Sequence, residues 1–209
     1  VMSIQRPLAR YNLGHTMQSV FSNVYGTKDF NKNDITKVAE YTKLIKGLRV
    51  IGDNTFHETS LFVPADTAYQ ESIQKSLKPF KGVRHVVLVG IGGSSLGTEA
   101  VYHALKSDKT PKLYVVDSIE GGLVEGVVKE VSATALPKDI AVVVVSKSGN
   151  TTETVLNATR TLELLTKKYG GEIMKQVIFV GNAGTALMDA CALRGATTIP
   201  MPEVVGGRY

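Results

Sequence analysis

The chain has 209 residues, of which 43% are hydrophobic and 21% are charged, with only 7 prolines. This length allows one large domain or two small ones, and the composition excludes disordered, collagen-like and low-complexity proteins. The 24 Lys and Arg residues against 19 Asp and Glu residues give a net charge of +5; because the basic residues are scattered, we expect a solvated surface and no specific nucleic-acid partner.

Cysteine usage and hydropathy indicate the compartment. Cys191 is the single cysteine, which leaves no intramolecular disulfide framework and no multi-cysteine zinc site. No stretch approaches the roughly 18 to 20 continuous apolar residues of a membrane-spanning helix, and residues 1–7 lack the apolar core of a signal peptide. We therefore expect a cytoplasmic protein with no membrane partner and no metal, and we expect Cys191 to be buried in helix packing.

Residues 1–80 are predicted to form a helical N-terminal segment. Glycines divide this part into polar, helix-compatible stretches, and apolar residues between 34 and 45 recur at helical spacing. A second helix is expected from Asp66 to Leu77, because Pro79 marks its end.

The pattern changes from Val83 onward, where short apolar runs alternate with amphipathic segments. The apolar runs are residues 86–89, 113–116, 140–145, 177–180 and 197–199. They are too uniformly apolar for a sheet with one solvated face, so they predict parallel strands buried on both faces. Helices are expected at about residues 95–106, 118–132, 151–169 and 183–193.

This alternation predicts an α/β fold for residues 81–209, a three-layer αβα sandwich around a mainly parallel, doubly wound sheet. Such sheets bind ligands at the carboxyl ends of their strands, so the loops that follow the strands are the places to look for function.

The first such loop is residues 90–97, Gly-Ile-Gly-Gly-Ser-Ser-Leu-Gly. Its glycines let the backbone turn sharply near a ligand, and the amides at the start of the next helix suit a phosphate or carboxylate. Neither the dinucleotide-binding fingerprint nor the Walker A pattern fits these residues. The loop is predicted to be an anion cradle; the alternative is a tight turn whose serines cap the helix.

The second loop is residues 146–154, Ser-Lys-Ser-Gly-Asn-Thr-Thr-Glu-Thr, in which five of nine residues carry a hydroxyl group. These donors follow a buried strand and precede a long helix, where they could converge on phosphate oxygens. No base and nucleophile pair is visible, which favours binding over covalent chemistry. The alternative is helix capping, with Asn150 as N-cap and Glu153 three residues later.

These two loops, together with the terminal Gly-Gly-Arg-Tyr at 206–209, resemble three ordered signatures of the phosphoglucose isomerase family. The first two signatures recur in sugar-isomerase domains in general, and the third narrows the resemblance. The resemblance implies an aldose–ketose isomerase that interconverts glucose 6-phosphate and fructose 6-phosphate through a cis-enediolate in glycolysis and gluconeogenesis. It also implies a cytoplasmic homodimer that needs no cofactor.

The resemblance assigns roles to individual positions. It implies that the sugar phosphate is held by four residues of the second loop: Ser146, Lys147 through its backbone, Ser148 and Thr151. Gly93 and Ser94 would line the opposite wall. Arg208 matches the catalytic arginine of the family, whose permanent charge stabilises the enediolate.

The sequence departs from the family pattern in two respects. Asn150 stands where many relatives have threonine, which removes one hydroxyl. The proton-abstracting glutamate, ring-opening histidine and late lysine of the family lie beyond the arginine signature. We therefore expect the second sugar-isomerase domain to be absent from this chain, and the chain alone to be incomplete as an enzyme. The alternatives are a sugar-phosphate-binding regulatory module and another isomerase with a sugar-isomerase domain, such as a phosphoheptose or aminosugar-phosphate isomerase.

Overall fold

The computed structural model describes residues 32–51 and 57–206. The chain divides into two compact units, residues 1–53 and 54–209. In the first unit, helix α2 spans Lys32–Ile51. The helix expected from the spacing within residues 34–45 is therefore confirmed, and it extends further in both directions.

The second unit opens with a 3-10 helix over His57–Ala65, followed by α3 over Thr67–Leu77. The side chain of Asp66 caps α3 by accepting a hydrogen bond from the Tyr69 amide at 3.0 Å, and a 3-10 turn that contains Pro79 follows Leu77. The predicted helix from Asp66 to Leu77 is thus confirmed.

Helix α3 and the turn after it pack against the sheet. The Tyr69 hydroxyl donates to the carbonyl oxygen of Pro200, at 3.0 Å, and Phe80 is buried against Ala141, Ile178 and Ile199. The division of the chain at residue 80 remains a prediction, but residues 66–80 share a core with the strands.

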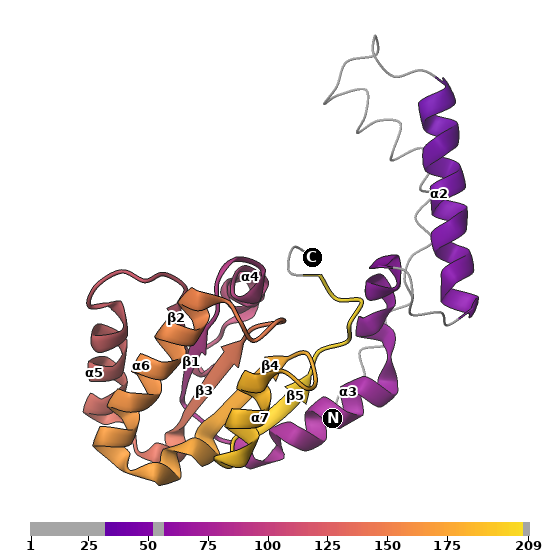
Figure 1. Ribbon diagram of the computed structural model, residues 1–209. Helices are drawn as coiled ribbons and strands as arrows, with labels where there is room; N and C mark the ends of the chain where they lie inside the picture. Colours follow the sequence, from indigo (N-terminus) through magenta and orange to yellow (C-terminus); the bar gives the residue numbers. More distant parts are fainter. Residues whose placement is uncertain (1–31, 52–56, 207–209) are drawn as a thin grey trace. The chain divides into compact units, whose positions relative to one another are not determined.

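The sheet has five strands in the order β2-β1-β3-β4-β5 (Figure 1). Every neighbouring pair is parallel. The strands are β1 His85–Val89, β2 Lys112–Val116, β3 Ile140–Val145, β4 Val177–Gly181 and β5 Thr197–Pro200. The connecting helices are α4 Leu96–Leu105, α5 Leu123–Thr134, α6 Thr152–Tyr169 and α7 Ala186–Leu193. The predicted α/β fold with a parallel sheet is confirmed.

Helix α5 begins later than expected from the apolar spacing of residues 118–132. Gly122 adopts a left-handed conformation with φ of 90°, and the helix starts at the next residue. Since glycine alone tolerates this region without strain, the Gly121–Gly122 pair makes a turn where helical periodicity had suggested the first turn of the helix.

The two faces of the sheet are buried to different degrees. Helices α5, α6 and α7 cover one face (Figure 1), where Val87, Val142 and Phe179 have no exposed surface. On the other face, which α3 covers beside β5, Val143 and Val180 are only half-buried. The prediction of burial on both faces is therefore confirmed fully for one face and in part for the other, within the described residues.

Neither described segment, 32–51 or 57–206, contains a helix that is long and apolar enough to cross a membrane. Cys191 lies on α7; its thiol is free and buried in the core, as predicted.

Candidate functional site

The strand order creates one topological switch point, between the adjacent strands β1 and β3. The chain leaves β1 toward β2 on one side, and it leaves β3 toward β4 on the other. Crevices for ligands form at such points, outside the carboxyl ends of the strands. The two loops that the sequence singled out, residues 90–97 and 146–154, follow these two strands.

The first loop begins in close contact with the end of β3. A methyl group on Gly90 would lie 2.9 Å from Cβ of Ser94 and 3.2 Å from the carbonyl oxygen of Val145, the last residue of β3. Space for a side chain is therefore lacking at position 90, and the close approach of this loop to the end of β3 depends on glycine there.

The first loop turns tightly before α4. Gly92–Ser94 form a 3-10 turn in which Gly92 has φ of 60°. Ser95 precedes α4 and is fully buried, and its hydroxyl lies 3.4 Å from the Gly92 carbonyl oxygen. Within the described part of the chain this hydroxyl does not cap α4, so the capping alternative for Ser95 is wrong. Gly93 is exposed and Ser94 is half-exposed, which leaves both open to a ligand.

The second loop gathers hydroxyl groups at the N-terminus of α6. Ser146 is 2% exposed, and its hydroxyl donates to the Thr151 hydroxyl oxygen at 3.5 Å. The Ser148 hydroxyl accepts from the amide of Asn150 at 3.2 Å. The helix begins one residue later than the capping alternative required, with Thr151 as N-cap. The assignment of Asn150 as N-cap is therefore wrong: Asn150 lies in the turn before the helix, and its amide donates to the Ser148 hydroxyl there.

This end of α6 is suited to an anion. The first amides of a helix have no intrahelical acceptor, and the dipole of an 18-residue helix adds positive potential there. Within the described part of the chain, the side chain of the N-cap residue Thr151 makes no hydrogen bond to these amides. The hydroxyls of Ser146 and Thr151 lie together beside them.

Lys147 connects this loop to the segment that leads to Arg208. Its ammonium group donates to the carbonyl oxygen of Glu203 at 3.0 Å, and its own carbonyl oxygen accepts from the Asn182 amide at 2.9 Å. The backbone of Lys147 is thus held by the residue after β4, and its side chain by the C-terminal segment. Arg208 itself, the predicted catalytic residue, lies outside the described residues.

Two residues that the sequence reasoning missed support the second loop from β4. A methyl group on Gly181 would lie 2.3 Å from the carbonyl oxygen of Ser146. The neighbouring Asn182 buries its Oδ1 atom, for which the described residues offer no hydrogen-bond partner. The sequence did offer a signal for Gly181, because a glycine at the end of an otherwise apolar strand indicates a close approach of another backbone.

An ion pair lies at the opposite edge of the sheet. Arg84 precedes β1 and Asp139 precedes β3; their side chains form an ion pair at 2.8 Å. The hydrogen bond from Arg84 lowers the pKa of Asp139. The pair joins β1 and β3 at their amino ends, whereas the two loops follow the carboxyl ends of the same strands. Its role is therefore structural. Within residues 32–51 and 57–206, no group of His, Cys, Asp and Glu side chains could hold a metal ion.

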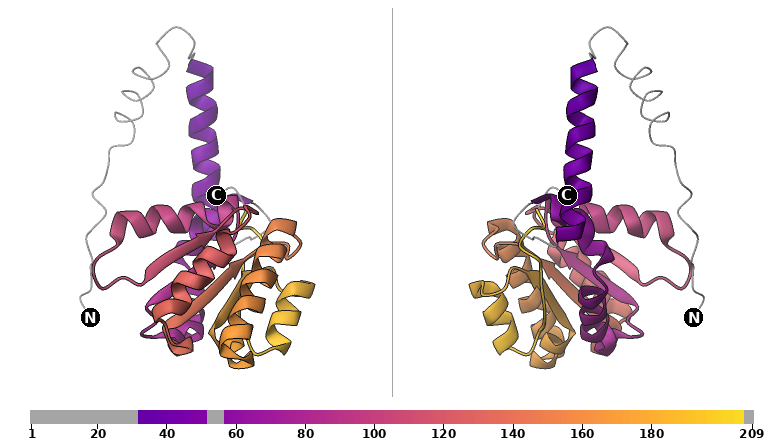
Figure 2. Two further views of the ribbon diagram at one scale, coloured as in Figure 1. Left: turned by 90° about the vertical axis from the view of Figure 1, so that its left-hand side faces the viewer. Right: turned by 90° about the vertical axis from the view of Figure 1, so that its right-hand side faces the viewer.

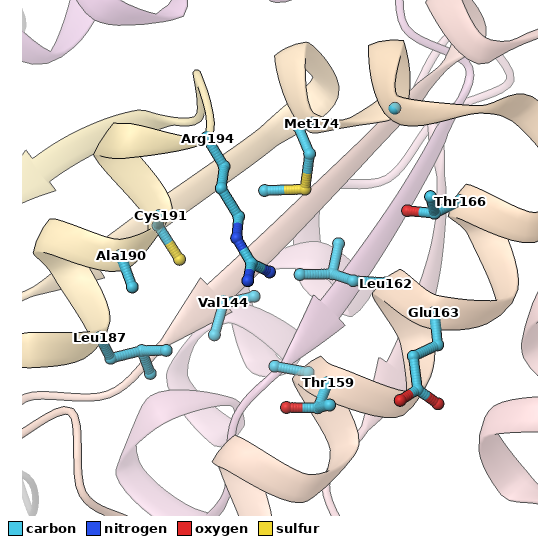
Figure 3. Close-up of a pocket in the computed structure, with 12 residues that line it drawn as sticks. Val144, Thr159, Leu162, Glu163, Thr166, Met174, Leu187, Ala190, Cys191 and Arg194 are labelled. Atoms are coloured by element: carbon cyan, nitrogen blue, oxygen red, sulfur yellow. The ribbon is translucent and has the colours of Figure 1, made fainter.

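A pocket of about 800 Å³ lies elsewhere, between α6 and α7 (Figure 3). Its lining includes the apolar side chains of Val144, Leu162 and Met174, and Arg194 extends into it. A sugar phosphate needs many converging donors, which this apolar pocket lacks. The two loops are therefore the better candidate site.

Comparison with known proteins gives a consistent result. The model of a family described as phosphoglucose isomerase matches residues 13–209. The glucose-6-phosphate isomerase of Clostridium tetani is 28% identical over 92% of this chain and 46% of its own length. The glucose-6-phosphate isomerase of Paraburkholderia phymatum is 33% identical over 62% of this chain and 24% of its own length.

Solved structures show the same fold. A glucose-6-phosphate isomerase from Chlamydia trachomatis matches 73% of this chain and 27% of its own, with a TM-score of 0.53 and 25% identity. A hypothetical protein from Thermus thermophilus matches 83% of this chain and 42% of its own, with a TM-score of 0.65 and 23% identity. The chain thus spans about a quarter of the length of the Paraburkholderia phymatum relative and about half of that of the Clostridium tetani relative.

Proposed function

Because this chain belongs to the phosphoglucose isomerase family, we propose that it supplies the phosphate site and one catalytic arginine of an aldose–ketose isomerase. The enzyme interconverts glucose 6-phosphate and fructose 6-phosphate. The observation that carries this proposal is the position of the two loops, which follow the adjacent parallel strands β1 and β3 at the switch point, beside the open N-terminus of α6.

The phosphate group binds at the start of α6. Its oxygens accept hydrogen bonds from the hydroxyls of Ser146, Ser148 and Thr151, and from backbone amides of the same loop that include Lys147. The helix dipole contributes roughly 0.3–1 kcal/mol for a charge at this end. Gly93 and Ser94 contact the phosphate or the sugar from the loop after β1.

The chemistry is a proton transfer between carbons 2 and 1 of the open-chain sugar through a cis-enediolate. The substrate's own carbonyl group acidifies the neighbouring C–H bond, so a positioned base and charge stabilisation suffice and no cofactor is required. Arg208 stabilises the negative charge on the enediolate oxygens, since its guanidinium group keeps its charge and donates several hydrogen bonds. The general base comes from outside the two loops.

Three further features belong to the same proposal. Residues 81–209 form a sugar-isomerase domain, the protein acts in the cytoplasm, and it works as a homodimer. The hydroxyl-rich loops support the first of these, and the single reduced and buried Cys191 is compatible with the second. The third rests on the family resemblance.

Kinetics of serine variants test the site. In the complete enzyme, Ser146→Ala and Ser148→Ala should each raise KM for fructose 6-phosphate roughly 10- to 100-fold, because a hydrogen bond to a charged group is worth about 1.5–3 kcal/mol. A coupled assay of glucose 6-phosphate formation measures this, with inorganic phosphate as inhibitor. Ser72→Ala, on the exposed surface of α3, is the matched control.

Unchanged KM and unchanged phosphate inhibition in both variants would overturn the site assignment. Binding of sugar phosphate by the complete product without turnover would instead support the regulatory module. The 209-residue chain alone should bind weakly and show no substantial turnover; robust activity would reveal a base within it.

A further inference from the structure

The segment after β5 is attached to the carboxyl end of β4. Residues 201–206, here called the strap, belong to no helix or strand, and in Figure 2 they form the yellow coil that leads from β5 toward the C-terminus. The strap begins with a backbone hydrogen bond, in which the Met201 amide donates to the Gly181 carbonyl oxygen at 2.7 Å. Arg208 follows the strap by two residues. The path of the strap therefore bears directly on where this arginine can reach.

One side chain of the second loop, residues 146–154, binds the middle of the strap. The ammonium group of Lys147 donates to the main-chain carbonyl oxygen of Glu203 at 3.0 Å. Lys147 is half-buried, whereas Glu203 is exposed, and among the described residues neither of them belongs to an ion pair. The contact thus uses the backbone of the strap and not the carboxylate of Glu203, so it fixes the position of the strap itself.

The other end of Lys147 is anchored in the second loop. Its carbonyl oxygen accepts a hydrogen bond from the Asn182 amide at 2.9 Å. The turn that follows is closely packed, because a methyl group on Gly149 would lie 3.0 Å from Cβ of Thr185. The Lys147 side chain therefore joins a fixed point of the loop to the strap.

The proposed reaction gives this connection a purpose. The phosphate group is on carbon 6 of the sugar, whereas negative charge develops on the oxygens at carbons 1 and 2. The enzyme must therefore hold the phosphate site and Arg208 at a constant separation. A misplacement of about 1 Å between a catalytic group and the reacting atoms can lower the rate about 100-fold.

We propose that Lys147 is a positioning residue, whose side chain fastens the strap to the phosphate-binding loop and so sets the place of Arg208 relative to the bound phosphate. This inference rests on the proposed function. It assigns the ammonium group to the strap and only the backbone of Lys147 to the substrate.

Kinetics of the complete enzyme test this role. Lys147→Met keeps most of the aliphatic stem but removes the donor, so kcat should fall roughly 10- to 100-fold. KM for fructose 6-phosphate and inhibition by inorganic phosphate should stay near their wild-type values, because the backbone contacts of the loop remain. Lys147→Arg should restore most of kcat, since it also presents a charged donor. Lys129→Met, on the exposed side of α5, is the matched control and should behave as the wild type.

Wild-type kcat in Lys147→Met would overturn the proposal. So would a large loss of inhibition by inorganic phosphate in this variant, because the ammonium group would then bind the phosphate itself. If Ser146→Ala and Ser148→Ala leave KM unchanged, the proposed function fails; if they raise KM while Lys147→Met matches the wild type, only the role of Lys147 fails.

Hydrogen exchange gives a readout that does not depend on activity. In the complete protein, amide exchange within residues 201–206, measured by mass spectrometry, should be roughly three- to tenfold faster in Lys147→Met than in the wild type or in Lys129→Met. Exchange in β3 and β4 should be unchanged, which shows that the variant is folded. Unchanged exchange in the strap would contradict the proposed attachment.

Discussion

Gly181 lies where β4 meets the phosphate loop, and its replacement tests how that loop is supported. A methyl group there would lie 2.3 Å from the carbonyl oxygen of Ser146 and 2.7 Å from Cε1 of Phe179. Neither neighbour can yield easily, because the first atom belongs to the backbone at the end of β3 and Phe179 has no exposed surface. Gly181→Ala would therefore force β3 and β4 apart at their carboxyl ends.

Overpacking of a filled core typically costs about 1–3 kcal/mol. Because the methyl group would meet a backbone atom, we expect Gly181→Ala to lower the free energy of unfolding by about 3 kcal/mol, the upper end of this range. At about 2–4 °C per kcal/mol for a domain of this size, the melting temperature should fall by about 6–12 °C. Thermal and urea unfolding should be followed by far-UV circular dichroism, because the chain contains 0 tryptophans.

Gly126→Ala in α5 is the matched control. In the described structure a methyl group there meets no atom within 4 Å, and alanine should stabilise the helix by about 0.5–1 kcal/mol. A Gly181→Ala protein as stable as the wild type would refute the close packing of Gly181 against Ser146.

Two further predictions concern titrating groups. Asp139→Asn should destabilise the protein at pH 7. Because Arg84 lowers the pKa of Asp139 in the folded state, this stabilisation is complete above the unfolded-state pKa of about 3.9 and is lost as pH falls through the lower folded-state pKa. The gap between the wild-type and variant melting temperatures should thus close on acidification, and a widening gap would contradict the assignment. Burial raises the pKa of the Cys191 thiol, so an aromatic disulfide reagent at pH 8 should react with it only after urea unfolding; rapid reaction with the folded protein would contradict its burial.

The sheet was predictable because parallel strands buried on both faces are continuous apolar runs. The run at 140–145 became β3 with the same bounds. The start of α5 was not predicted correctly, since the spacing of apolar residues from 118 onward is helical and the left-handed turn at Gly122 overrides it. Local capping rules also failed at Asn150, because the turn after β3 runs one residue further and the helix begins after Thr151.

The candidate site was predictable to the level of its loops. Glycine and hydroxyl residues after β1 and β3 indicated an anion site, and the parallel order of the strands brings those two loops together. The support from Gly181 could not be read from the sequence, because it depends on the distance between β3 and β4. The role of Arg208 stays a prediction.

The phosphate site is tested most directly by an NMR titration of the isotopically labelled chain with glucose 6-phosphate. We predict saturable shifts of the amide signals of residues 90–97 and 146–154, with inorganic phosphate shifting mainly the second loop. Shifts that gather around Arg194 in the pocket between α6 and α7, or loops that do not respond at all, would contradict the proposed site.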